Sequence, residues 1–158
     1  MNQAVQKDTK YQLEQIKEII QKTDNSRDQK LQKVCEVLSR EEPAFDWVGF
    51  YIVDPDAQRE LVLGPFAGAP TEHTRIAFGK GICGQAAETN ETFVVQDVHE
   101  ADNYLSCSAQ VRSEIVVPIK KKGKFIAELD IDSHTKNAIT DRHRNLLEKV
   151  CGLVSELF

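Results

Sequence analysis

The sequence predicts an α+β protein in which helices from both ends of the chain pack on one mainly antiparallel sheet. Apolar residues recur at helical spacing near both ends of the 158-residue chain. Between them lie about six short segments rich in β-branched and aromatic residues, separated by turn sequences. Short connections favour antiparallel pairing of successive strands, and the terminal helices can then cover the sheet.

The N-terminal segment, residues 1–40, is expected to hold two amphipathic helices. Apolar side chains recur at helical spacing between Tyr11 and Lys22, and a second group follows further along. The groups are Leu13, Ile16, Ile19 and Ile20, then Leu31, Val34, Cys35 and Leu38. Between them the run Thr-Asp-Asn-Ser at 23–26 supplies side chains that cap helices. The break is therefore a turn within a helical hairpin.

The middle of the chain, residues 45–133, is expected to form the sheet and its pocket. The aromatic and β-branched run at 46–53 predicts a strand that ends in the turn Asp-Pro-Asp, and residues 60–63 are its hairpin partner. Further strands are expected at 75–78, 92–96, 114–119 and 125–131. The run Lys-Lys-Gly-Lys at 121–124 predicts a tight turn between the last two strands.

The last segment, residues 141–158, is expected to be a helix. Its apolar residues at helical spacing are Leu146, Leu147, Val150, Cys151, Val154 and Leu157. No internal repeat, low-complexity run or Pro/Gly/Ser-rich linker interrupts the sequence. We therefore expect a single domain over residues 1–158, with N-terminal helices at 1–40, the sheet at 45–133 and the closing helix at 141–158.

The composition excludes several classes of protein. It is 41% hydrophobic and 28% charged, and the net charge of −5 is spread along the chain. A spread acidic charge argues against nucleic acid as a partner. The first residues lack the apolar centre of a signal peptide, and no run reaches the roughly 18 apolar residues of a membrane span. We expect a cytoplasmic protein that does not associate with membranes.

The four cysteines lie far apart, without a CxxC motif or a Cys/His pair at zinc-site spacing. This argues against a disulfide framework and against a metal knuckle, and no metal is expected. Cys35 and Cys151 fall on apolar helical stripes, where a cysteine behaves as a small hydrophobic residue. The remaining two, Cys83 and Cys107, are the candidates for reactive thiols.

Each of these two thiols allows two interpretations. Cys83 ends a glycine-rich run at 79–84 that precedes a short helix expected at 85–88, and a thiol near a helix N-terminus is favoured as the thiolate. The alternative is a buried turn cysteine. Cys107 lies in a polar run, 103–108, that predicts an accessible loop, where a thiol is either reactive or a chance surface cysteine.

Acidic residues alternate along the strand expected at 125–131. The period of two places Glu128, Asp130 and Asp132 on one face, opposite an apolar face of Ala127, Leu129 and Ile131. Neighbouring carboxyls raise one another's pKa, so that one can donate a proton near neutral pH and the group can attract an ammonium ion. Glu114 joins them if its strand pairs with this one. The alternative is an edge strand with a solvated acidic face.

The histidines show no metal-site spacing. His99, His134 and His143 are expected on the surface or in loops.

Six motifs occur in an order that resembles the free methionine-R-sulfoxide reductases, from about residue 30 to the C-terminus. They are Trp47-Val48-Gly49-Phe50-Tyr51, Leu61-Val62-Leu63-Gly64-Pro65-Phe66, Gly79-Lys80-Gly81-Ile82-Cys83-Gly84, Asp97-Val98-His99, Ser113-Glu114-Ile115-Val116-Val117-Pro118 and Leu129-Asp130-Ile131-Asp132-Ser133. The resemblance implies a single GAF-like domain whose closed pocket holds one free methionine sulfoxide.

The resemblance also assigns residues. Cys107 stands where the family has its attacking cysteine, and Cys83 where it has a second redox cysteine. The pocket acids correspond to Glu114, Asp130 and Asp132, and the aromatic substrate contacts to Trp47 and Tyr51. The implied reaction is thiol-dependent reduction of free L-methionine-R-sulfoxide through a cysteine sulfenic acid and an intramolecular disulfide. Thioredoxin or a similar dithiol would recycle the enzyme, no cofactor is required, and a homodimer is a family habit.

The chain departs from the family pattern at three places. His73 replaces a third cysteine, Ser108 replaces an aspartate after Cys107, and Glu128 occupies a position that is generally apolar. These departures keep two other functions open. One is a non-catalytic GAF domain that binds or senses a small molecule, and the other is a redox sensor that uses Cys83 and Cys107 without a substrate.

Overall fold

The computed structural model describes residues 2–101 and 109–158, and in them six strands form one antiparallel sheet. The strands, in the spatial order β3-β2-β1-β6-β5-β4, are β1 (Trp47–Asp54), β2 (Ala57–Ala67), β3 (Arg75–Ala77), β4 (Phe93–Val95), β5 (Ser113–Lys121) and β6 (Lys124–Ser133). The α-helices are α1 (Asn2–Gln21), α2 (Arg27–Glu41), α3 (Gly81–Thr89) and α4 (Asp141–Val154). Short 3₁₀ helices occur at Val98–Glu100 and Ser155–Leu157. The predicted fold class is confirmed.

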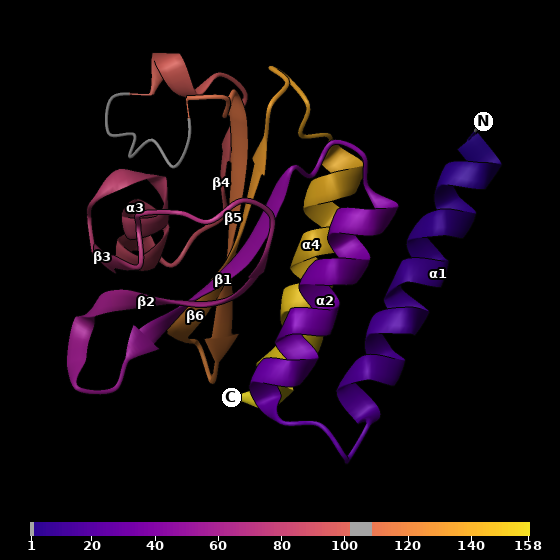
Figure 1. Ribbon diagram of the computed structural model, residues 1–158, viewed down its shortest axis with the longest axis horizontal. Coiled ribbons are helices and arrows are strands. Elements are labelled where there is room, and N and C mark those ends of the chain that lie inside the picture. The colour runs from indigo at the N-terminus through magenta and orange to yellow at the C-terminus, as the bar shows by residue number, and fades with distance from the viewer. Residues whose placement is uncertain (1, 102–108) are drawn as a thin grey trace.

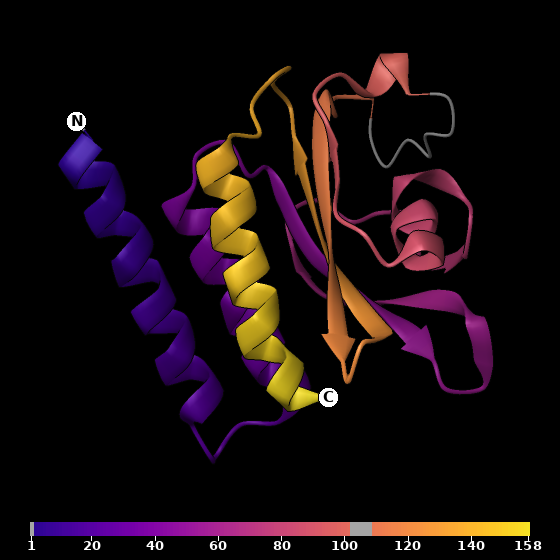
Figure 2. The same cartoon turned by 180° about the vertical axis from the view of Figure 1, so that it is seen from behind.

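Helices cover the two faces of the sheet unequally. Figure 1 and the reverse view in Figure 2 show α2 and α4 against one face, with α1 on their outer side. The short helix α3 packs on the opposite face, against β5 and β6. The larger core lies between the sheet and the α2/α4 layer, and a smaller apolar cluster lies under α3.

The helix boundaries follow from capping. The Ser26 hydroxyl accepts the backbone N–H of Gln29 at 3.2 Å, and the Gln29 side chain accepts the Ser26 N–H at 2.8 Å. This reciprocal capping box starts α2 and confirms the predicted break between the first two helices. Thr140 and His143 form the same arrangement at the start of α4. In the described part of the chain, no helix has both the length and the apolar character needed to cross a bilayer.

The two faces of β6 differ as the alternation predicts. Ala127, Leu129 and Ile131 are buried in the helix-covered core, and the acidic residues between them point to the other face. Because β6 lies between β1 and β5, it is a central strand. The alternative of a solvated edge strand is therefore wrong.

The hairpin between β5 and β6 turns at Lys122 and Gly123. Both residues have positive φ, 53° and 77°, as a two-residue type I′ turn requires, and Lys121 pairs with Lys124 across it. The predicted tight turn is confirmed. The turn, together with a register irregularity between Ile119 and Lys120, places Glu114 opposite Asp132.

Two local predictions were wrong. Helix α3 begins at Gly81 and not at residue 85, so Cys83 lies within its first turn and not before it. His143 was expected on the surface, but it is only 4% exposed. Its Nδ1 accepts the backbone N–H of Thr140 at 3.1 Å, and its Nε2 lies 3.2 Å from Oε2 of Glu42. The cap and the buried carboxylate explain why this histidine points inward.

A buried polar cluster around Glu42 joins three helices. Arg142 of α4 donates to both carboxylate oxygens at 2.7 and 2.9 Å, and Gln12 of α1 donates at 3.2 Å. Burial works to raise the pKa of Glu42, but hydrogen bonds from His143, Arg142 and Gln12 outweigh it and lower that pKa to about 2. The cluster therefore stabilises the fold by holding α1 and α4 to the end of α2.

We expect Glu42→Ala to lower the free energy of unfolding by about 3–5 kcal/mol at pH 7, because Arg142 would lose its buried partner. A folded-state pKa below the ordinary value means that this contribution is complete above pH 4.5 and is lost as the pH falls toward 2. Urea unfolding at several pH values from 7 to 3 measures the free energy of unfolding of the variant and of the wild type. The difference between the two should become smaller as the pH falls. The control is Glu41→Ala, which removes a solvent-accessible pair with Arg40 and should cost about 1 kcal/mol or less. A difference independent of pH would contradict the assignment.

Candidate functional site

Four buried carboxyl groups, which we call the acid cluster, line the face of the sheet under α3. They are Glu114 from β5 and Glu128, Asp130 and Asp132 from β6, and each is at most 3% exposed. Apart from Glu114 and Cys83, the described residues offer no hydrogen-bond donor to the oxygens of the three β6 acids. Carboxylates buried in this way cannot all be ionised without a large cost in free energy.

Burial is the main cause of the raised pKa of every member of the acid cluster. For Glu114, the charges of Asp130 and Asp132 add to this increase, as do hydrogen bonds in which Glu114 holds the proton. For Asp130, hydrogen bonds with Glu114 and Cys83 partly offset the effect of burial. The pKa of each acid is thus raised, as the alternation of acids suggested, although burial and not the neighbouring charges is the largest cause.

Helix α3 places Cys83 beside the acid cluster. One donor atom each from Cys83, Glu114 and Asp130 lie within 4.8 Å of one another, and all three residues are buried. Of the two interpretations of Cys83, the structure favours the buried cysteine over the thiolate. Burial raises the pKa of this thiol well above its ordinary value, and the neighbouring carboxyls raise it further. These effects outweigh the helix N-terminus, so that Cys83 is a thiol at neutral pH.

The other candidate redox thiol, Cys107, lies outside the described residues, as does Ser108. Its distance from Cys83 therefore stays a prediction.

His73 shares a small cavity with the acid cluster. The cavity has a volume of about 10 Å³, and Cys83 and Glu114 also line it. The backbone carbonyl of His73 accepts the Tyr51 hydroxyl at 2.8 Å. Tyr51 is fully buried and does not line this cavity or the larger one described next. Its role in the structure is to support the residues around the site.

A larger cavity of about 210 Å³ opens at the other end of the acid cluster. Its walls are Asp46, Trp47, Ala69, Pro70, Thr71, Gln110, Val111, Asp132 and His134. The Trp47 indole stacks on Phe66 with ring centroids 5.5 Å apart, and its Nε1 donates to the Ala69 carbonyl at 3.0 Å. A side chain at Gly49 would lie 2.3 Å from the Trp47 ring, so a glycine is needed there. An aromatic wall and a buried acid thus face one space.

Of the nine residues that line this cavity, only Trp47 and Asp132 were predicted as site residues, and Asp46 and His134 are among those that were not. The Asp46 carboxylate accepts the backbone N–H of His134 at 2.7 Å. Each residue lies one position beyond a strand, Asp46 before β1 and His134 after β6, and β1 and β6 are paired. Their position at paired strand ends was the available signal, but it depends on knowing that β1 and β6 are neighbours.

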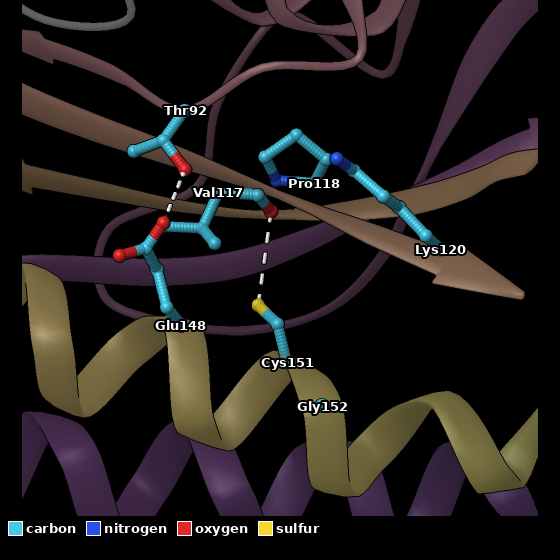
Figure 3. Close-up of a pocket in the computed structure, with 7 residues that line it drawn as sticks. All are labelled: Thr92, Val117, Pro118, Lys120, Glu148, Cys151 and Gly152. Atoms are coloured by element: carbon cyan, nitrogen blue, oxygen red, sulfur yellow. Dashed lines mark hydrogen bonds between the residues drawn. The ribbon is translucent and has the colours of Figure 1, made fainter. Parts of the chain in front are cut away.

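The two cysteines predicted to be structural lie on the helix-covered side of the sheet. Cys151 donates to the Val117 carbonyl at 3.7 Å beside a crevice of about 230 Å³, in which Thr92 also donates to Glu148 (Figure 3). Cys35 donates to the Pro65 carbonyl at 3.5 Å. Burial raises the pKa of both thiols. This crevice contains no member of the acid cluster, whereas the two cavities described above are each lined by a member of it and form the candidate site.

Comparisons with known proteins agree on one family. Residues 24–158 match the GAF domain family. The chain is 40% identical to "GAF domain-containing protein A" of Dictyostelium discoideum over 73% of this chain and 71% of that protein. It is 38% identical to the free methionine-R-sulfoxide reductase of Saccharomyces cerevisiae over 70% of this chain and 62% of that protein. A structure of free methionine-R-sulfoxide reductase from Neisseria meningitidis in complex with its substrate is 35% identical, with a TM-score of 0.88 over 95% of this chain and 87% of that one.

Proposed function

The chain belongs to the GAF domain family and, within it, to the free methionine-R-sulfoxide reductases, and from this we propose that it reduces free methionine-R-sulfoxide to methionine. The observation that carries the proposal is the buried acid cluster, which has a buried thiol at one end and a cavity with an aromatic wall at the other. A sulfoxide needs a proton donor for its oxygen and an apolar contact for its methyl group. Asp132 and Trp47 offer both in one cavity.

In the proposed first step, the Cys107 thiolate attacks the sulfoxide sulfur while one carboxyl of the acid cluster donates a proton to the oxygen. The sulfur–oxygen bond of the substrate breaks, the oxygen passes to Cys107 as a sulfenic acid, and methionine is released. Glu114, Asp130 and Asp132 are the proposed proton donors. The raised pKa of Cys83 supports this order, because a protonated thiol is a poor attacking group.

In the proposed second step, the Cys83 sulfur attacks the Cys107 sulfenic acid. A disulfide forms, the Cys83 proton leaves, and the sulfenic oxygen departs as water. A thioredoxin-like dithiol then reduces the disulfide by exchange. Neither step needs an organic cofactor.

The acid cluster also supports selection of a free amino acid. An ammonium group can enter a buried site only against negative charge, and the carboxyl groups supply that charge. A peptide-bound residue would place a neutral amide there and leave any ionised carboxylate uncompensated. We therefore propose that free methionine sulfoxide is preferred to the peptide-bound form.

The proposal predicts turnover of a single substrate. NADPH consumption coupled through thioredoxin and thioredoxin reductase should occur with the R epimer of free methionine sulfoxide. It should be at background with the free S epimer and with both peptide-bound epimers. Absence of turnover with all four compounds, for a folded protein with reduced cysteines, would exclude this reaction with this reductant.

One observation favours a second candidate, a GAF domain that binds methionine sulfoxide without reducing it. His73, and not a third cysteine, lies beside Cys83. Calorimetric binding of the sulfoxide without formation of methionine would support this candidate over the enzyme.

A further inference from the structure

A candidate metal-binding group of one sulfur and two oxygen donors is formed by Cys83, Glu114 and Asp130, and no sequence motif predicts it. Their three donor atoms lie within 4.8 Å of one another, although the residues come from α3, β5 and β6. One thiol and two carboxyls are the kinds of ligand that zinc accepts in proteins. Because the three residues are far apart along the chain, no spacing of ligands in the sequence indicates this group.

A second observation indicates a cation. The carboxyl oxygens of Asp130 and of the adjacent Glu128 are fully buried, and Glu114 and Cys83 are the only groups in the described part of the chain that offer them a hydrogen bond. The partners of these acids are thus themselves an acid and a thiol. A dication would compensate the charge of this buried group.

The adjoining cavity favours an ion over an organic ligand. Its volume of about 10 Å³ is close to the minimum for one water molecule, and Cys83 and Glu114 both line it. An amino acid does not fit this space, whereas a bare metal ion does. The larger cavity at the Trp47 end remains the place for an organic substrate.

We propose that the reduced protein binds one zinc ion between the sulfur of Cys83 and carboxylate oxygens of Glu114 and Asp130. Zinc bonds to thiolate sulfur at about 2.3 Å and to carboxylate oxygen at about 2.0–2.2 Å, so small side-chain movements bring the donors to the metal. Binding replaces the thiol proton and the carboxyl protons, which pass to solvent. The thiolate selects zinc over magnesium and calcium, which prefer oxygen ligands.

Zinc at this position would inhibit the reductase, a consequence that rests on the proposed function. The metal would occupy Glu114 and Asp130, which are the proposed proton donors to the sulfoxide. It would also bind Cys83, which is the proposed resolving thiol. Inhibition should be reversed by a chelator and should weaken at high concentrations of free methionine-R-sulfoxide.

Cobalt(II) is a suitable probe, because its absorption spectrum reports tetrahedral geometry and thiolate ligation. We expect the reduced full-length chain, titrated anaerobically, to bind one equivalent with a thiolate-to-cobalt charge-transfer band. Zinc should displace the cobalt, and magnesium should not. Cys83→Ser should remove the band and lower the affinity about tenfold or more. Cys151→Ser, which removes a buried thiol on the other side of the sheet, should retain both.

Two further variants complete the test. Asp130→Asn should keep the thiolate band but weaken binding, and Cys107→Ser should bind as the wild type does. Circular dichroism verifies folding of each variant. Retention of the band in Cys83→Ser, its loss in Cys107→Ser, or no cobalt binding by the wild type would each overturn the proposal.

The titration contains no sulfoxide and no thioredoxin, so the two proposals fail separately. Cobalt binding without sulfoxide turnover would contradict only the reductase. Sulfoxide turnover without cobalt binding would contradict only the metal site.

Discussion

Cys107→Ser is expected to abolish formation of methionine from free methionine-R-sulfoxide, with a loss of at least roughly 10³-fold in rate. The serine hydroxyl is a far weaker nucleophile than a thiolate, and the buried acids supply protons without supplying a nucleophile. The measurement is a single turnover without reductant, in which the methionine formed is counted per chain. The wild type should form about one equivalent, because one sulfenic acid or disulfide forms for each sulfoxide reduced.

Cys83→Ser is the matched variant for the single-turnover experiment on Cys107→Ser. It should still form one equivalent of methionine, since attack precedes resolution. Steady-state turnover with thioredoxin should nevertheless fall to a small fraction of the wild-type rate. The control for loss of a cysteine is Cys35→Ser, which should behave as the wild type. The Cys35 thiol is buried and donates a hydrogen bond to the Pro65 carbonyl. An intact first turnover in Cys107→Ser together with its loss in Cys83→Ser would reverse the two roles.

Asp130→Asn should lower kcat/KM for free methionine-R-sulfoxide by about 10²–10⁴-fold and also raise stability. The amide keeps the shape of the side chain but cannot donate the carboxyl proton in the reaction. It also removes a buried acid for which, among the described residues, only Glu114 and Cys83 offer a hydrogen bond. A gain of about 1 kcal/mol would raise Tm by roughly 2–4 °C. Opposite changes in activity and stability distinguish a functional acid from a structural one.

The stability gain of Asp130→Asn should depend on pH. Because folding raises the pKa of Asp130, the folded state is favoured where this carboxyl is protonated. That contribution is complete below the ordinary pKa of about 3.9 and is lost as the pH rises above it. In urea unfolding, the free energy of unfolding of the variant should therefore exceed that of the wild type by more at pH 7.5 than at pH 4.5. The exposed control Asp24→Asn should change neither activity nor stability appreciably. If Asp130→Asn lost both activity and stability, the role of this acid would be structural.

Much of the acid cluster was predictable because its pattern is local. The alternation from Ala127 to Asp132 determines which side chains share a face, whatever strand lies beside them. The turn at Lys122 and Gly123 is encoded within four residues and predicts that the two strands pair. The two short patterns therefore predict three acids on one face of a strand next to that of Glu114. The pairing of Glu114 with Asp132 also depends on the register irregularity between Ile119 and Lys120, which neither pattern predicts.

Burial of the acids could not be predicted from the same patterns. It depends on β1 pairing with β6, which brings Trp47 opposite Asp132 across a long stretch of chain. The environment of Cys83 has the same origin, since α3 must pack on β5 and β6 before the acids can raise its pKa. Similarly, His143 has a surface-like sequence context but meets a carboxylate at the end of α2. In each case the deciding contact is distant in sequence.

Because successive residues of β6 face opposite sides of the sheet, the register that buries its apolar residues in the core also places its acids in the site. Odd-numbered positions from Ala127 to Ile131 fill the helix-side core, and even-numbered positions hold the acids. A slip of one position against β1 would insert carboxyls among Leu146, Leu147 and their neighbours and give the pocket an aliphatic wall. Such a slip could not yield a stable but inactive conformer, because it would destroy the core at the same time. A chain that folds with an intact core therefore also has its acids on the pocket side of the sheet.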